Sequence, residues 1–118
     1  MKYVNLTPHA VRVTFQCIDH HFDPLLHPHN VTWEPSGVVA RVSSEHKRSG
    51  SFAEVPHFTV EYGDVSGLPE PEEGTVYIVS MLVLQATDRD DVVAPASGHP
   101  DVVRKDGQIW SVPGFVRK

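Results

Sequence analysis

The sequence has little cysteine, no long apolar run and no apolar leader. Cys17 is the only cysteine of the 118 residues, so no disulfide can form within the chain, and a reducing compartment fits. No apolar stretch approaches the roughly 20 residues that a membrane-spanning helix needs, and residues 1–5 lack the apolar core of a signal peptide. These absences predict a cytoplasmic protein with no membrane partner.

An excess of positive charge and the common catalytic motifs are also missing. The formal net charge is −5, whereas nucleic-acid binding normally needs a basic face, so we expect no bulk nucleic-acid partner. The chain holds no G-x-S-x-G elbow, no G-x-x-x-x-G-K-[ST] phosphate loop and no G-x-G-x-x-G dinucleotide motif. No cofactor is expected, and whether the protein is an enzyme stays open.

An all-apolar strand that continues into a short helix is the most informative segment. Val76–Val79 is β-branched or aromatic at every position, which predicts a strand buried on both faces. Ser80 is a good N-cap, and Met81–Ala86 predicts the main helix. Because free N–H groups at such a joint can bind anions, Ser80 is a candidate ligand-binding residue.

Most other segments predict short strands, from their alternating or apolar patterns. The expected strands are Lys2–Leu6, Ala10–Phe15, Val31–Glu34, Val38–Val42, Phe58–Tyr62 and Asp91–Ala94. The last of these could run parallel to the central strand, since the link between them contains the helix.

Turn signals separate these strands. Pro35-Ser36-Gly37 is expected to join two neighbouring strands, and Glu45–Gly50 and Gly67–Gly74 are expected to be polar loops. Asp106-Gly107 lies between two apolar runs, which predicts a C-terminal hairpin over residues 102–112.

These elements predict one α+β domain over residues 1–118, with a mixed, mostly antiparallel sheet, one main helix and a C-terminal hairpin. Residues 17–30 interrupt the pattern and are expected to form a His-rich loop or insertion. Its imidazoles and the carboxylate of Asp19 suit zinc or nickel, but their spacing fits no metal motif, so we favour a solvated loop and expect no metal site. The histidines concerned are His20, His21, His27 and His29.

Four motifs carry a resemblance to a known family. They are N-L-T-P-H at Asn5–His9, P-S-G-V-V-A-R-V at Pro35–Val42, the segment Tyr62–Ser80, and V-R-K-D-G-Q-I at Val103–Ile109. With them the chain resembles a family of small uncharacterised proteins of bacteriophages, prophages and some bacteria, with similar chains in fungi. The resemblance implies no activity and no catalytic residue. The N-L-T-x-H opening is also similar to that of some small CRISPR-associated proteins suspected of handling nucleotide signals.

Polar residues at the end of the first strand suggest a binding site. Asn5, Thr7 and His9 alternate, so an extended chain would place their side chains on one face, where they could bind a base, ribose or phosphate. In the alternative, Thr7 belongs to a turn and Asn5 only satisfies backbone groups. If the first and central strands are parallel neighbours, Ser80 lies at the same sheet edge and shares the pocket.

Three arginines could supply positive charge to such a site. Arg41 lies in an apolar run, and Arg89 and Arg104 flank the expected parallel strand. Each is a candidate anion clamp. The alternatives are exposure to solvent and, for Arg89 among its aspartates, local ion pairing.

Three functions follow, in this order. The first is binding of a small anionic, nucleotide-like ligand, for sequestering or sensing a signal in a phage or defence context. The second is a small phosphodiesterase-type hydrolase that uses His9 with Arg41 or Arg104. The third is a structural or interaction module, such as a homodimer formed through the strand edge at Ala10–Phe15.

Overall fold

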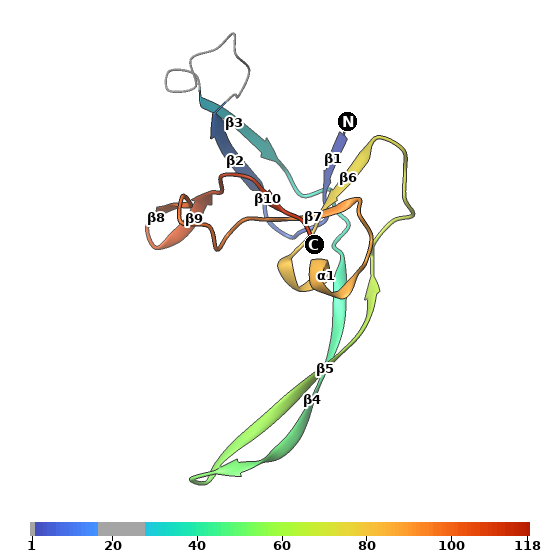
Figure 1. Ribbon diagram of the computed structural model, residues 1–118, viewed down its shortest axis with the longest axis vertical. Helices are drawn as coiled ribbons and strands as arrows, with labels where there is room; N and C mark the ends of the chain where they lie inside the picture. Colours follow the sequence, from blue (N-terminus) through green and yellow to red (C-terminus); the bar gives the residue numbers. More distant parts are fainter. Residues whose placement is uncertain (1, 17–27) are drawn as a thin grey trace.

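The computed structural model describes residues 2–16 and 28–118 (Figure 1). Within these residues the protein is mostly β, with several small sheets and one short helix after a central strand. In chain order the elements are β1 (Lys2–Asn5), β2 (Val11–Gln16), β3 (Pro28–Trp33), β4 (Arg41–Phe52), β5 (Val55–Ser66), β6 (Thr75–Ile78), α1 (Met81–Ala86), β7 (Val92–Pro95), β8 (Val103–Lys105), β9 (Gln108–Ser111) and β10 (Phe115–Val116).

The main sheet has four strands in the order β1-β6-β7-β10. β1 and β7 both run parallel to β6, and β10 runs antiparallel to β7. The sheet is therefore mixed, and the strand predicted parallel to β6 is confirmed as β7. The expectation of a mostly antiparallel sheet is wrong here, because the antiparallel pairs β2–β3, β4–β5 and β8–β9 form separate two-stranded sheets.

β6 is buried on both faces, which explains its lack of polar alternation. Tyr77 and Val79, the residue after the strand, pack on one side in a cluster with Leu6, Ala40, Val83, Leu84, Val92 and Ala94. Ile78 packs in a second cluster with Val11, Val13, Val93 and Val112. Tyr77, Ile78 and Val79 are 3%, 0% and 0% exposed, so the predicted central strand is confirmed.

Helix α1 begins and ends where the sequence predicts. The Ser80 hydroxyl accepts a hydrogen bond from the Val83 N–H at 3.3 Å, which satisfies a free N–H group of the first turn. Thr87 takes an extended conformation, with φ −123° and ψ 149°, and ends the helix. The two buried helix residues, Val83 and Leu84, pack against the main sheet, so α1 covers one of its faces.

Strand β2 covers the other face of the main sheet. It pairs antiparallel with β3, and its buried residues Val11 and Val13 pack against Ile78. β3 begins inside the predicted loop of residues 17–30, so the end of that loop is corrected to a strand. Residues 17–27 of the predicted loop lie outside the described part of the chain.

Two predicted turns have different outcomes. The turn at residues 35–37 does not join two paired strands, since β3 pairs with β2 and β4 begins only at Arg41. The preceding residue, Ala40, packs in the core instead, and its N–H donates to the Leu6 carbonyl at 3.0 Å. The C-terminal hairpin is confirmed, with Asp106 and Gly107 at φ 54° and 78°, as a type I′ turn requires.

Strands β4 and β5 form a long hairpin, here called the arm, that projects from the rest of the molecule (Figure 1). The longest extent of the protein is 60 Å and its radius of gyration 17.6 Å, against about 13.5 Å for a compact domain of this length. The strand predicted at Phe58–Tyr62 is confirmed within β5. The loop predicted at Glu45–Gly50 is wrong, since these residues belong to β4. A ribbon with water on both faces needs no apolar alternation, so its polar pattern resembles that of a loop.

Backbone conformation defines both ends of the arm. At the tip, Ala53 and Glu54 form the two-residue turn with φ 49° and 67°, a conformation usually provided by Asn-Gly. At the base, Gly67 has φ 77°, and a side chain there would collide with the Val39 carbonyl. Glycine is therefore required where the arm rejoins the body.

Replacing Ile78 with aspartate should unfold the protein. Ile78 is 0% exposed, and an unpaired carboxylate there should cost more than about 4 kcal/mol. Ile109→Asp is the matched control, because Ile109 is 42% exposed on β9. Thermal denaturation followed by circular dichroism should show no folded baseline for Ile78→Asp and a nearly unchanged Tm for Ile109→Asp. A wild-type Tm for Ile78→Asp would contradict the burial of β6.

Candidate functional site

Three of the predicted site residues lie around one cavity. Thr7, Arg41 and Ser80 line a hollow of about 230 Å³ between the turn after β1, the start of β4 and helix α1. This convergence follows from the topology, because β1 and β6 are parallel neighbours and their carboxyl ends meet at one sheet edge. Most of the other lining residues are apolar.

Asn5 is a structural residue of the turn after β1. Its Nδ2 donates to the carbonyls of His9 at 2.8 Å and Trp33 at 2.9 Å. Its Oδ1 accepts from the Thr7 N–H at 2.9 Å and lies 2.7 Å from the Thr7 hydroxyl. Two donors and two acceptor positions are all that an amide side chain has. Asn5, which is 2% exposed, therefore ties the turn together and has no bond left for a ligand.

The three cavity residues contribute unequally to binding. The Thr7 hydroxyl lies within hydrogen-bond distance of Asn5 Oδ1 and the His9 carbonyl, so its proton is used within the turn. The Ser80 oxygen already caps α1. Arg41 is exposed and is the only cation among the lining residues. The cavity is also smaller than the roughly 300–1,000 Å³ of typical small-molecule sites.

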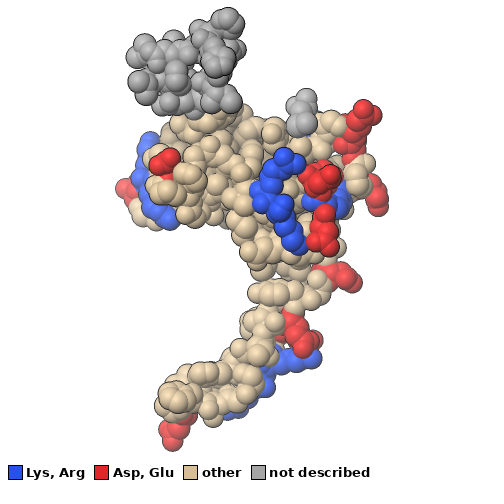
Figure 2. All heavy atoms as spheres, in the orientation of Figure 1, with Lys and Arg blue, Asp and Glu red and all other residues tan. Residues whose placement is uncertain are grey.

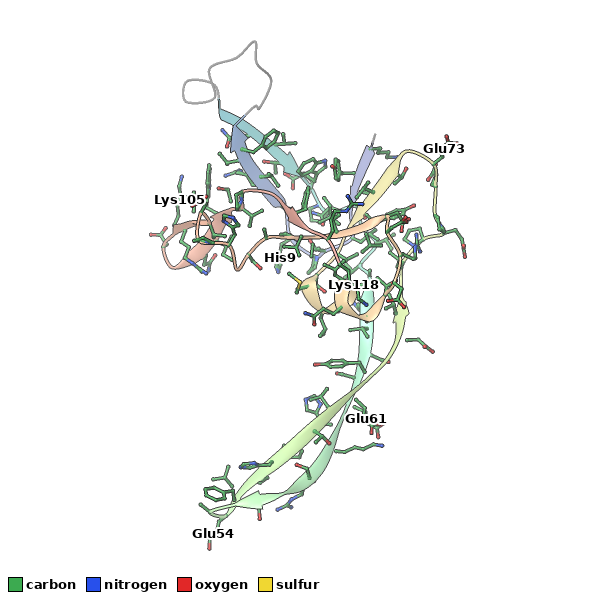
Figure 3. All side chains as sticks on the ribbon, viewed as in Figure 1. His9, Glu54, Glu61, Glu73, Lys105 and Lys118 are labelled. Carbon is green, nitrogen blue, oxygen red and sulfur yellow. The ribbon has the colours of Figure 1, made fainter. Side chains whose placement is uncertain are left out.

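His9 and Arg104, which were predicted to share this site, do not line the cavity. His9 is exposed in the turn after β1 (Figure 3), and Arg104 is exposed on β8 in the C-terminal hairpin. A hydrolase that uses His9 beside Arg41 or Arg104 therefore gains no support from this geometry.

Arg89 forms a local ion pair and is not part of the cavity. Its Nε and NH2 groups contact the two carboxylate oxygens of Asp91 at 3.0 Å and 2.7 Å, and its NH1 group donates to the Pro69 carbonyl at 2.7 Å. The hydrogen bond between the two side chains raises the pKa of Arg89 and lowers the pKa of Asp91. Arg89 thus ties the loop before β6 to the start of β7, which is the local pairing considered as its alternative role.

Residues 2–16 and 28–118 contain no group of three His, Cys, Asp or Glu side chains placed to hold a metal ion. No helix in this part of the chain is long and apolar enough to cross a bilayer. Cys17 and the predicted loop histidines at 20, 21 and 27 lie outside the described residues, so the expectation for that loop stays a prediction.

The arm has one face with apolar side chains, which also carries Arg48 opposite Phe58, and one charged face. Phe58, Val60 and Tyr62, here called the apolar stripe, alternate along β5 and are 57%, 38% and 55% exposed. On the opposite face, Lys47 Nζ lies 2.9 Å from the Glu61 carboxylate. Figure 2 shows charged atoms along one side of the arm and uncharged atoms along the other.

The apolar stripe is a candidate site that sequence reasoning missed. The alternation of Phe58–Tyr62 predicts a strand, but it does not tell whether the apolar face of that strand is buried. In the structure the pairing strand β4 is polar opposite the stripe, and residues 44–48 offer no apolar face to a core. The tip adds two more exposed apolar side chains, Phe52 at 74% and Val55 at 59%. The absence of apolar residues from a long segment beside an apolar strand is the signal that could have indicated the arm.

Comparison of the chain with protein-family models, curated proteins and solved structures finds no match. The resemblance to the phage-type family therefore stays a prediction from its four motifs. The function has to be argued from the geometry of the arm and of the cavity.

Asp91→Asn should destabilise the protein in a pH-dependent way. At neutral pH it removes the charged contact with Arg89, and the free energy of unfolding should fall by about 1–3 kcal/mol. Because folding lowers the pKa of Asp91, its contribution is present above the unfolded-state pKa of about 3.9. The contribution is lost as the pH falls through the lower folded-state pKa.

Urea unfolding at neutral pH and in strong acid measures this difference. Wild type and Asp91→Asn should differ at neutral pH and converge in acid. Asp88→Asn is the control, because the Asp88 side chain is 98% exposed and pairs with the exposed Lys118. A difference between wild type and Asp91→Asn that is equally large in acid would contradict the ion-pair origin of the stabilisation.

Proposed function

We propose that the protein is an interaction module and that the arm is the element with which it binds a protein partner. The observation that carries this proposal is the apolar stripe, whose large side chains stand on a ribbon with both faces in solvent. Monomeric proteins rarely expose contiguous apolar surface without a binding role. The arm projects from the body (Figure 1), where a partner can reach both of its faces.

The energetics of the arm favour a partner. A two-stranded ribbon is marginally stable in water, and a third strand or a covered face is needed for stability. Phe58 and Tyr62 are each more than half exposed. Covering one such aromatic side chain should contribute about 2 kcal/mol, from about 100 Å² of apolar surface. A partner on the arm thus supplies the burial that the chain itself does not.

The charge of the arm favours a protein over a nucleic acid. Residues 41–66 hold three basic and four acidic side chains, which gives a formal charge of −1. A β-ribbon that binds nucleic acid needs an excess of Lys and Arg side chains that face the phosphates. The mixed charges of the arm suit the polar rim of a protein interface.

Photo-cross-linking from the arm tests this proposal. A photoreactive phenylalanine analogue at Phe58 or Tyr62 should form covalent adducts with protein, in the purified sample or in cells that express the chain. Ile109 is the matched control site, since it is an exposed apolar residue of another hairpin. Adducts at the stripe that do not exceed those at Ile109 would overturn the proposal.

A second candidate function is binding of a small anion in the cavity beside Arg41. The specific observation is that Thr7, Arg41 and Ser80, all expected to bind an anionic ligand, line the same hollow. Apolar residues around one exposed cation suit a small nucleotide-like ligand held by a single charged contact.

Thermal-shift measurements with AMP and inorganic phosphate test the second candidate. Binding to the folded state raises Tm by linkage, and this rise should disappear in Arg41→Gln. Arg104→Gln is the control, because Arg104 lies outside the cavity on β8. No shift in the wild type, or an equal shift in Arg41→Gln, would exclude the cavity as an anion site.

A further inference from the structure

We infer that the partner of the arm is a second copy of this chain, joined edge to edge through β4 in a two-fold pairing centred on His46. This inference rests on the proposed function and names its partner. It follows from which strand edge is open and from the order of charges along that edge.

The strand edge at Ala10–Phe15, which the sequence suggested for a homodimer, is already paired within the chain. β2, which includes most of Ala10–Phe15, pairs with β3 on one side and bridges to Val112 on the other. The Thr14 N–H donates to the Val112 carbonyl at 3.0 Å, and the Val112 N–H donates to the Arg12 carbonyl at 3.0 Å. β2 therefore has no free edge along its middle, and association through it is not available.

The arm offers two outer edges, and one of them is blunted. Pro56 lies in β5 opposite Ser51. A proline is tolerated in a paired strand only where its missing N–H would face outward, so Pro56 removes a donor from the outer edge of β5. β4 has no proline in its twelve residues. Its outer edge presents backbone N–H and C=O groups to solvent, which is the arrangement that invites a further strand.

A bulge limits the regular part of β4 on the side of the tip. The register shift between Arg48 and Gly50 adds one residue to β4, whereas the shift between Val42 and Ser44 adds one residue to β5. At the other end, Val42 packs against the core cluster at the base of the arm. A pairing centred on His46 spans Ser44–Arg48 and is clear of both the base and the bulge.

The charges of this segment select one two-fold register. Pairings centred on Glu45, Lys47 or Arg48 place a charge directly opposite its own copy, which is destabilising. A pairing centred on Ser44 places two basic residues opposite each other. The pairing centred on His46 instead places Glu45 opposite Lys47 of the second copy, twice, with no like charges opposed. A pairing centred on Ser43 would also oppose Arg41 to Glu45, but it uses the base of the arm, where Val42 packs against the core cluster. Among the pairings clear of that base, self-complementary charge thus selects His46.

The pairing would turn two ribbons into one four-stranded sheet. It supplies the further strand that an isolated two-stranded ribbon lacks, and the apolar stripe on β5 stays outside this contact. Glu45, Lys47 and Glu61 share a face, because Glu45 lies opposite Glu61 and Lys47 already contacts it at 2.9 Å. In Figure 3, Glu61 lies along the arm between the body and the tip residue Glu54, so the contact lies clear of both ends. The segment has only about five residues, and we therefore expect a concentration-dependent dimer with a dissociation constant of about micromolar or weaker.

Charge exchange between two variants tests the inference. Glu45→Lys alone and Lys47→Glu alone each place like charges opposite each other, so sedimentation velocity at low salt should show association weakened about tenfold or more. A mixture of the two variants should associate again, because each lysine then meets a glutamate. The double variant E45K/K47E should also associate, and high salt should weaken each of these dimers.

Glu73→Lys and Lys2→Glu are the matched controls. They change the charge equally at exposed residues outside the arm, and both should associate like the wild type. Figure 3 shows Glu73 on the loop before β6, away from the arm. Circular dichroism should show that all variants keep the wild-type fold, since the substituted residues are exposed.

Each contrary result has a distinct meaning. Single variants that associate like the wild type, or a mixture that fails to associate, would overturn the pairing through β4. A wild type that stays monomeric into the high micromolar range would overturn the second copy as partner. In each case, cross-links from Phe58 or Tyr62 to another protein would leave the proposed function standing. Loss of those cross-links as well would remove the proposed function too.

Discussion

Burial of β6 on both faces is the constraint on which the rest of the structure depends. Tyr77, Ile78 and Val79 are almost fully removed from water, and neither side of the strand can be left open without exposing them. Helix α1 follows directly and covers one side. β2 and the segment at Val112 cover the other. The main sheet can therefore be parallel at its centre, as sheets covered on both faces often are.

The position of β6 also determines what the polar residues of the turn after β1 do. The carboxyl ends of β1 and β6 meet at one sheet edge, and the chain has to leave that edge without burying unpaired backbone groups. Asn5 meets this need with four hydrogen bonds to the turn and to Trp33. A motif that suggested ligand binding thus anchors the fold, and of its three polar residues only Thr7 lines the neighbouring cavity.

The arm is the part of the chain that the core does not use. Because β6 is already covered, β4 and β5 pair only with each other. They contact the body at the base of the arm, where Val42 and Val65 pack against the core cluster. Beyond that base the ribbon has solvent on both faces, and Phe58, Val60 and Tyr62 of its apolar stripe stay 57%, 38% and 55% exposed. The exposed strand edges and apolar side chains that are available to a partner therefore lie on the arm, outside the compact body.

Local chemistry determined much of the fold from the sequence alone. The apolar run of β6, the Ser80 cap with α1, and the Asp106-Gly107 hairpin were predicted because each depends on neighbouring residues. Which strands pair with each other across long distances in the sequence was decided only by the tertiary structure. The residues at 45–50 became a strand because β5 pairs with them, although their own pattern is polar. Likewise, Arg41 lines the cavity and Arg89 does not. Long-range packing places Arg41 there, whereas the ion pair with Asp91 holds the Arg89 guanidinium elsewhere, so sequence spacing did not determine either position.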